Sequence, residues 1–291
     1  MNSFVIISDS SCDIPSQLID KYSINIVPFY VSLDHEKYLK EIDELSVEAL
    51  TSSLVNDHIY PKTSNPPIAD YIDKFKPHLE AGTDILCFTL TEKFSGSYQS
   101  AVNAASLLLE EYPSRKIRVI NSCLATGAQG LLVLQAAYMC HAGLTLDETA
   151  NKAEQLKETG RVYFTVDSLD YLQKGGRIGK VGAFAGQILN IKPIIALKEG
   201  ELIPQSKVRG SKKAIKEIMD LTLGDVNRNP EDYDYCFVTS NRFDEIECVQ
   251  ALLMDDYSID VPFVSIIGAT IGAHVGPTVF GICLVKKYNK L

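Results

Sequence analysis

The sequence predicts a two-part α/β fold in which a mainly parallel sheet is followed by a mixed one. The first observation is that short apolar runs alternate with amphipathic segments through the first half of the chain, as parallel strands joined by crossover helices do. The second is that two apolar runs flank Glu199-Gly200, a pattern typical of a β-hairpin. We therefore expect an N-terminal domain over 1–160, a C-terminal domain over 161–291, and a cleft between them.

The elements of the first half follow one another in strand–helix order. A strand is expected at 4–7, then a polar loop, a helix that Pro15 opens, and a strand at 24–33. Ser46 caps a helix that ends near residue 56, and three prolines predict that 59–67 is irregular. The same alternation predicts helices at 68–79, 98–111 and 126–141 and strands at 85–90 and 117–120.

The second half opens with a helix and ends with strands. Thr145 and Glu148 form a capping pattern for a helix over 145–158, and 162–166 is expected to be a strand. A helical stretch follows and is broken at Gly175-Gly176. The remaining pattern predicts hairpin arms at 194–197 and 202–208, helices at 212–223 and 244–257, and strands at 236–239, 261–267 and 278–285.

The composition describes an acidic globular chain. It has 291 residues, 46% of them hydrophobic, a net charge of -9 and a pI near 5.1. The acidity disfavours nucleic-acid binding and loose adsorption to anionic membranes, although transient membrane contact stays open. The N-terminus resembles a strand and not a signal peptide, and no apolar run approaches the ~18 residues of a membrane span. We expect a cytoplasmic protein whose seven widely spaced cysteines are free thiols.

Most signatures of catalysis and of metal binding are missing. The chain contains no Walker-type phosphate loop, no G-x-G-x-x-G after a strand, and neither H-E-x-x-H nor G-x-S-x-G. Its five histidines show no spacing that suits a metal ion. We expect no metal site and no cofactor.

Two loops carry hydroxyl groups that suit an anion. Thr63 and Ser64 lie in a proline-stiffened loop, and Ser95, Gly96 and Ser97 lie between a buried strand and a helix. Free N–H groups at a helix start bind anions, and a glycine lets the backbone approach a ligand closely. Both loops also read as plain helix caps. The missing P-loop lysine favours a singly charged carboxylate over a polyphosphate.

Two further segments are candidates for binding. His274 lies in a glycine-rich stretch after a strand, where α/β proteins bind ligands, although a structural histidine is an equal alternative. Lys174, Arg177 and Lys180 form one basic segment, and Lys207 and Arg209 another. In an acidic protein this contrast predicts a docking surface for a partner, with a solvated surface as the alternative.

These segments, in this order, resemble the DegV family of fatty-acid-binding proteins. The likeness spans nearly the whole chain and is carried by SDSSCDIP at 8–15, KTSNPP at 62–67, FSGSYQSA at 94–101, YLQKGGRIG at 171–179, KVRG at 207–210 and IGATIGAHVGP at 267–277. The resemblance implies the two-domain DegV-like fold, with a long-chain fatty acid between an N-terminal parallel sheet and a C-terminal mixed sheet.

The resemblance also implies roles for individual residues. Thr63 and Ser95 would hydrogen-bond the carboxylate, with Ser64 in the same loop, Gly96 would add a backbone N–H, and His274 would lie in the surrounding polar network. The loops depart from the usual family pattern in three respects. The hydroxyl loop has Asn65 for glutamine and Pro67 for serine, Ser97 stands where threonine is common, and Thr278 follows Gly276-Pro277 where glycine is frequent. None of these changes removes a carboxylate donor.

The resemblance implies a lipid-binding protein and not a stand-alone enzyme. Family members present the fatty acid to a separate ATP-binding kinase subunit, which makes an acyl phosphate, and Arg177 and Arg209 would then belong to the docking surface. The alternative is a phosphotransferase of the dihydroxyacetone kinase-like class that holds its substrate covalently on a histidine, for which His274 is the candidate. Intact and denatured mass measurements distinguish the two, because a carrier loses the mass of its fatty acid on denaturation and a covalent complex does not.

Overall fold

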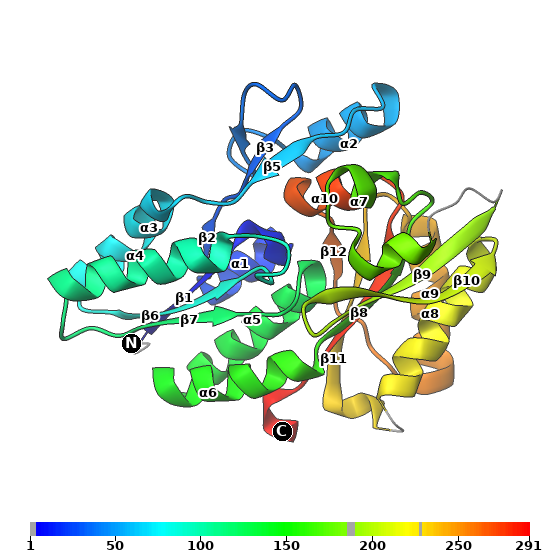
Figure 1. Ribbon diagram of the computed structural model, residues 1–291. Helices are drawn as coiled ribbons and strands as arrows, with labels where there is room; N and C mark the ends of the chain where they lie inside the picture. The colour runs from blue at the N-terminus through cyan, green and yellow to red at the C-terminus, as the bar shows by residue number, and fades with distance from the viewer. Residues whose placement is uncertain (1–3, 185–189, 227–228) are drawn as a thin grey trace.

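Three β-sheets organise the part of the chain that the computed structural model describes, residues 4–184, 190–226 and 229–291 (Figure 1). The first sheet has the order β2-β1-β6-β7 and is parallel throughout. Its strands are β1 (Phe4–Asp9), β2 (Asn25–Val27), β6 (Asp84–Thr89) and β7 (Ile117–Asn121). The parallel N-terminal sheet of the predicted fold class is confirmed.

The second sheet is mixed and lies in the C-terminal half. Its order is β10-β9-β8-β13-β11-β12, and within it only β11 and β12 pair in parallel. The predicted hairpin is confirmed, with φ of 54° at Glu199 and 80° at Gly200, as a type I′ turn requires. The strands are β8 (Arg161–Thr165), β9 (Ile191–Lys198), β10 (Glu201–Arg209), β11 (Tyr233–Thr239), β12 (Val264–Ile266) and β13 (Phe280–Lys286).

Helices cover both sheets in layers (Figure 1). Helices α3 (Ile68–Glu80) and α4 (Ser97–Glu111) pack on one face of the parallel sheet, and α5 (Thr126–His141) and α6 (Leu146–Leu156) lie on the other. Helices α8 (Ser211–Asp225) and α9 (Phe243–Tyr257) cover the outer face of the mixed sheet.

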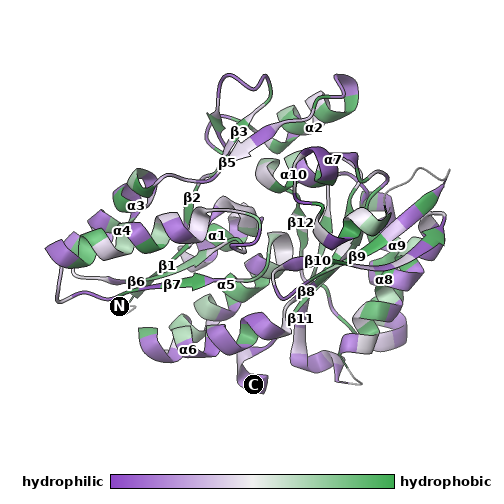
Figure 2. Ribbon diagram, in the orientation of Figure 1, coloured by the Kyte–Doolittle hydropathy of each residue, from purple (hydrophilic) through white to green (hydrophobic). Residues whose placement is uncertain are grey.

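Helix α5 lies between the two sheets. It contacts β1 on one side and β11 and β13 on the other, and nearly every residue in it is buried. A helix that is apolar on every face is expected in such a position. Figure 2 shows the contrast with α4, α6 and α8, which carry both hydrophilic and hydrophobic residues. Because α5 joins the sheets in one shared core, it fixes how the two halves face each other.

A small third sheet was not predicted. It has the order β4-β3-β5 and consists of β3 (Tyr30–Ser32), β4 (Leu39–Lys40) and β5 (Lys62–Ser64), with α2 (Val47–Asn56) packed beside it. We call residues 28–67 the small lobe. The single strand predicted at 24–33 is wrong, because the chain leaves the parallel sheet at Pro28, which has no N–H to donate. The irregular stretch predicted at 59–67 is also wrong in part, since Thr63 pairs with Val31.

The glycine-rich segment 268–277 contains a short helix, α10 (Ala269–Val275), which we had treated as a loop. The capping box of Thr145 and Glu148 at α6 is confirmed, and α7 (Asp170–Lys174) ends before Gly175 as predicted. The remaining elements are α1 (Ser16–Tyr22) and the 3₁₀ segments η1 (Ser10–Cys12), η2 (Lys157–Thr159), η3 (Gly179–Phe184), η4 (Pro230–Asp232) and η5 (Tyr288–Lys290).

Two properties of the whole chain bear on its function. Within the described ranges, none of the helices combines the length and the apolar character that crossing a bilayer requires. All seven cysteines are free, and burial raises the pKa of the Cys12 thiol to about 12, so this thiol is not a reactive thiolate at neutral pH. The domain boundary at residue 160 stays a prediction.

Candidate ligand-binding site

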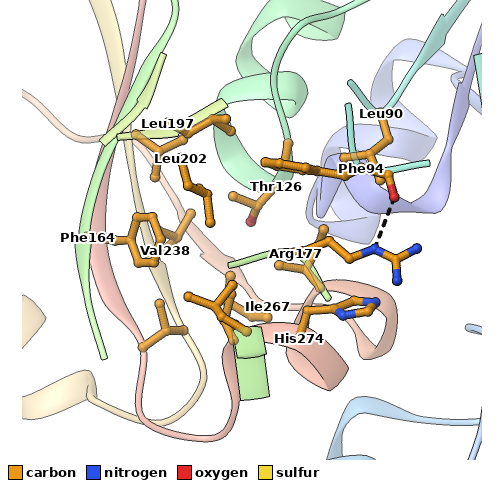
Figure 3. Close-up of a pocket in the computed structure, with 16 residues that line it drawn as sticks. Leu90, Phe94, Thr126, Phe164, Arg177, Leu197, Leu202, Val238, Ile267 and His274 are labelled. Atoms are coloured by element: carbon orange, nitrogen blue, oxygen red, sulfur yellow. Dashed lines mark hydrogen bonds between the residues drawn. The ribbon is translucent and has the colours of Figure 1, made fainter. Parts of the chain in front are cut away.

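An apolar pocket lies where the two sheets approach each other, and both halves of the chain line it (Figure 3). Leu90 follows β6, Ala125 and Thr126 stand at the start of α5, and strand residues of the mixed sheet form the opposite wall. The other apolar lining residues are Phe94, Val162, Phe164, Leu172, Leu197, Leu202, Val238, Ile267, Ile271, Val275 and Val279. The pocket therefore offers a hydrophobic surface to a ligand held between the two sheets.

Polar side chains gather at one end of this pocket. In Figure 3 the guanidinium of Arg177 and the ring of His274 lie side by side, on the side away from Phe164, Leu197 and Val238. A ligand with one charged end and a long apolar body matches this division.

His274 is joined to the small lobe through Thr63. Its Nε2 lies 2.8 Å from Thr63 Oγ1, across 211 residues of sequence. Its Nδ1 is buried without a hydrogen-bond partner in the described part of the chain, and a Cβ at Gly175 would collide with it. Burial, with a smaller effect of the Arg177 charge, lowers the pKa of His274 to about 4. The ring is therefore neutral at pH 7.

The proton position on His274 decides what Thr63 can do. The tautomer that carries the proton on Nε2 donates to Thr63 Oγ1, and it leaves only a lone pair at the unpartnered Nδ1. The Thr63 hydroxyl hydrogen is then available to a ligand. The opposite tautomer would bury an N–H without an acceptor, which costs more.

The serine-glycine loop lies next to Thr63 and its neighbours. Gly96, and not Ser95, is the N-cap of α4, but Ser95 Oγ accepts the N–H of Ser97 in the first turn at 3.1 Å. That bond still leaves the Ser95 hydroxyl hydrogen to donate. Asn65 joins the two loops, because its Nδ2 donates to Ser100 Oγ at 3.0 Å while its Oδ1 lies against Gly96.

Arg177 lies at the pocket, whereas the sequence predicts it on a docking surface. Its side chain is half-buried and lines the pocket. Nε donates to Phe94 O at 3.2 Å and Nη1 to Gly175 O at 2.6 Å, which leaves Nη2 as the guanidinium nitrogen without a protein acceptor among the described residues. The site thus contains a cation that the sequence analysis had assigned to the surface.

The comparisons with known proteins agree with this geometry. Residues 3–287 match the family model described as "Uncharacterised protein, DegV family". The chain belongs to the DegV family. It is 32% identical over 278 residues to a DegV domain-containing protein of Clostridium perfringens, with 95% of each chain covered.

Solved DegV structures have the same fold and bind fatty acids. A stearic acid-binding protein from Eubacterium ventriosum is 33% identical and superposes with a TM-score of 0.93, covering 99% of this chain and 100% of its own. A DegV family protein from Thermus thermophilus, described by its fatty acid binding, is 28% identical with a TM-score of 0.88, covering 98% and 99%. The DegV fold class is thereby confirmed.

Of the residues predicted for this DegV site, only His274 and Arg177 line the pocket. Thr63 contacts it through His274, and Ser95 and Gly96 directly follow the lining residue Phe94, whereas two further residues lie away from it. Ser64 is exposed on β5, and neighbouring strand residues point to opposite faces, so it does not share the face of Thr63. Arg209 is exposed at the end of β10. The other basic residues of the predicted docking surface are engaged locally, since Lys180 pairs with Glu201 at 2.6 Å and Lys207 lies 4.8 Å from the Phe184 ring centroid.

A buried polar network beneath the DegV ligand loops was missed from the sequence. Asp9 accepts the Ser97 hydroxyl at 2.6 Å and the Leu90 N–H at 2.8 Å, and the Tyr71 hydroxyl lies 2.6 Å from Ser97 Oγ. Burial is the largest influence on Asp9 and raises its pKa. The network fixes the start of α4, next to Ser95. The polar run directly after the first strand was the available signal.

The sequence predicts no metal site. In the described parts of this DegV chain, no group of three or more His, Cys, Asp or Glu side chains is arranged to hold a metal ion. The polar end of the pocket instead offers hydroxyls, backbone N–H groups and one guanidinium, which are ligands for an anion.

Proposed function

We propose that this chain binds a long-chain fatty acid in the pocket, as a cytoplasmic lipid-binding protein. The observation that carries the proposal is an apolar pocket with Arg177 and His274 at one end and two hydroxyls next to that end. Ser95 Oγ accepts the Ser97 N–H, and with His274 protonated on Nε2 the Thr63 oxygen accepts as well, so both hydroxyl hydrogens are left to donate. Two free donors beside a cation suit a carboxylate. The similarity to the stearic acid-binding protein supports the same ligand class.

The carboxylate would be held by several donors at once. Thr63 and Ser95 donate from their hydroxyls, Gly96 offers its backbone N–H, and Arg177 offers Nη2 beside His274. Each hydrogen bond to a charged group contributes roughly 1.5–3 kcal/mol, and several are needed to offset the cost of removing a carboxylate from water. We leave Ser64 out of this set because of its exposed position.

The acyl chain would supply most of the affinity. Burying about 14 methylenes at roughly 0.8 kcal/mol each gives on the order of 11 kcal/mol before costs. Lost translational and rotational freedom takes back several kcal/mol. The apolar lining therefore gives binding strength, while the polar end fixes the direction of the chain and selects acids over other lipids.

We further propose that the bound acid is presented to a separate ATP-dependent fatty acid kinase subunit, as the DegV resemblance implies. Arg209 lies exposed at the end of β10 and offers a basic docking residue on an acidic protein. Arg177 lies close enough to the ligand to act there as well as at the contact with the partner.

Mass measurement tests the binding proposal directly. Native mass spectrometry of the purified protein, after incubation with palmitate and oleate, should show one added fatty acid that is lost on denaturation. An increment that survives denaturation would favour the covalent, dihydroxyacetone kinase-like alternative. No increment, together with no acyl chain in a solvent extract, would refute fatty-acid binding.

Acyl-phosphate formation tests the presentation proposal separately. The loaded chain with ATP alone should form no acyl phosphate, and adding a fatty acid kinase subunit should start the reaction. Formation of acyl phosphate by the chain alone would show that it is itself the enzyme.

A further inference from the structure

A buried acid, Glu41, and a partly buried one, Asp13, lie against the first residues of α10, the helix that carries His274. Glu41, which is 2% exposed, accepts hydrogen bonds from the Thr270 N–H at 2.9 Å and from the Thr270 hydroxyl at 2.7 Å. Asp13 accepts the Gly268 N–H at 3.1 Å. Since Glu41 and Asp13 come from different parts of the chain, three distant segments meet where α10 begins.

Gly268 makes room for both acids. A Cβ at this position would lie 2.5 Å from Asp13 Oδ1 and 2.6 Å from Glu41 Oε1, so only a glycine permits this approach. Burial, and then the charge of Glu41, raise the pKa of Asp13 well above its usual value. Because two acids so close together repel each other when both are charged, the hydrogen bonds from Thr270 and Gly268 are what hold them in place.

The two acids are also tied to the rest of the molecule. Glu41 Oε2 accepts the Ser10 hydroxyl at 2.5 Å, and Ser10 Oγ in turn accepts the Phe29 N–H at 3.0 Å. Asp13 Oδ2 accepts the hydroxyl of Thr126 at 2.6 Å, at the start of α5 and in the pocket wall. The start of α10 is thus fixed against the small lobe, the first strand and α5.

The far end of α10 meets the small lobe again. Its seven residues span about 10 Å, and near its end His274 contacts Thr63. Glu41 and Thr63 both belong to the small lobe, so this lobe holds α10 at both ends. A change in direction where the helix begins would move His274 relative to Thr63.

We propose that Glu41 and Asp13 are positioning residues for the ligand site: they fix the first turn of α10 so that its last turn presents His274 to Thr63. Neither acid is among the residues that line the pocket: Glu41 acts through α10, and Asp13 acts through α10 and through Thr126. The effect on affinity rests on the proposed function, whereas the effect on α10 does not.

A double-mutant cycle tests this role with palmitate as the probe. Glu41→Ala is expected to weaken palmitate binding about tenfold, because the Thr63 hydroxyl loses its alignment. In a His274→Ala background, the same change should cause no further loss, since the residue through which it acts is gone. If Glu41→Ala weakens palmitate binding by the same factor in the parent and in the His274→Ala background, the proposal is wrong. Palmitate affinity would be measured by displacement of a fluorescent fatty acid.

Conservative variants separate positioning from general damage. Glu41→Gln keeps an acceptor for the Thr270 N–H and should recover most of the affinity, and a Gln variant as weak as the Ala variant would contradict the proposal. If Glu41→Ala does not fold, Thr270→Val and Thr270→Ser take its place. The Ser variant keeps the hydroxyl and should bind palmitate more tightly than the Val variant, and equal affinities would contradict the proposal.

Hydrogen exchange in the ligand-free protein gives a readout that is independent of fatty-acid binding. Glu41→Ala should speed amide exchange over 269–275. The matched control is Asp234→Asn, which changes a partly buried acid held by Gln135 at 2.6 Å, far in sequence from α10. Unchanged exchange in Glu41→Ala would refute the positioning role even if the parent binds palmitate. If Glu41→Ala exchanges faster than the parent over 269–275 but the parent binds no fatty acid, the positioning role stands and the proposed function is refuted.

Discussion

The two ends of the pocket are built in different ways. The apolar end includes strand side chains of the mixed sheet, such as Phe164, Leu197 and Val238, whose positions follow from the pairing of adjacent strands. The polar end consists of Arg177 and His274, which contact Phe94 and Thr63 from segments far apart in the sequence, and Ser95 directly follows Phe94. Affinity for an acyl chain is therefore spread over many non-directional apolar contacts, while selection of the carboxylate depends on a few directional hydrogen bonds.

The largest expected effect concerns the apolar end. Laurate has four fewer methylenes than palmitate, and at roughly 0.8 kcal/mol each it should bind about two orders of magnitude more weakly. Direct competition against a fluorescent fatty acid would give the ratio. Equal affinities would mean that the outer part of the acyl chain lies outside the pocket, and the contrast between the two ends would fail.

The next effect concerns the cation at the polar end. Arg177→Ala should weaken palmitate binding by about 10- to 100-fold, because a hydrogen bond from a charged group contributes roughly 1.5–3 kcal/mol. Arg209→Ala is the matched control, since this exposed arginine lies at the end of β10 and should leave palmitate affinity unchanged. An equal loss of affinity in both variants would contradict a direct contact between Arg177 and the carboxylate.

A smaller effect is expected from the hydroxyls. Thr63→Val and Ser95→Ala should each weaken palmitate binding about tenfold, because each removes one donor to a charged group. Ser64→Ala is the control for Thr63→Val, since Ser64 is exposed on the same short strand. If the Ser95 variant loses melting temperature but keeps affinity, its role is that of a helix cap alone.

The smallest effect is a pH dependence of folding stability. The pKa of His274 is lowered to about 4 in the fold, below its ordinary value near 6.5, so the unfolded chain takes up a proton first as the pH falls. Its contribution is therefore constant above pH 6.5 and becomes destabilising between pH 6.5 and 4.

A single substitution isolates this contribution. Relative to His274→Gln, the ligand-free parent should lose about 1 kcal/mol of unfolding free energy between pH 7.5 and 5.5. Urea titrations at the two pH values measure it, with the exposed His141→Gln as control. If the unfolding free energy changes equally with pH in the parent and in His274→Gln, His274 is not buried as a neutral imidazole.

The sequence predicted the regular elements better than the long-range contacts. Alternating apolar runs located both sheets, and Glu199-Gly200 located the hairpin, because these patterns are local. The small lobe was missed because β3 and β5 pair across about thirty residues and take their register from each other. Pro28 gave the only local signal that the chain leaves the first sheet.

The same reason separates the site residues that local sequence pattern proposes from those that it places elsewhere. Thr63 and Ser95 stand in loops whose composition already suits an anion. Arg177 stands between glycines, and its side chain is held at the pocket by hydrogen bonds to Phe94 O and Gly175 O, of which Phe94 is distant in sequence. Glu41 lies in an ordinary charged run, and nothing in that run indicates that it is buried against α10.

The most direct test of the account compares palmitate with hexadecan-1-ol, which has the same chain length and no carboxylate. The parent protein should bind palmitate at least tenfold more tightly than the alcohol, because only the acid can use all the donors at the polar end. In Arg177→Ala this preference should shrink, through weaker palmitate binding at nearly constant affinity for the alcohol. Equal affinities of the parent for both lipids, or a preference that Arg177→Ala leaves intact, would contradict a carboxylate held at this end of the pocket.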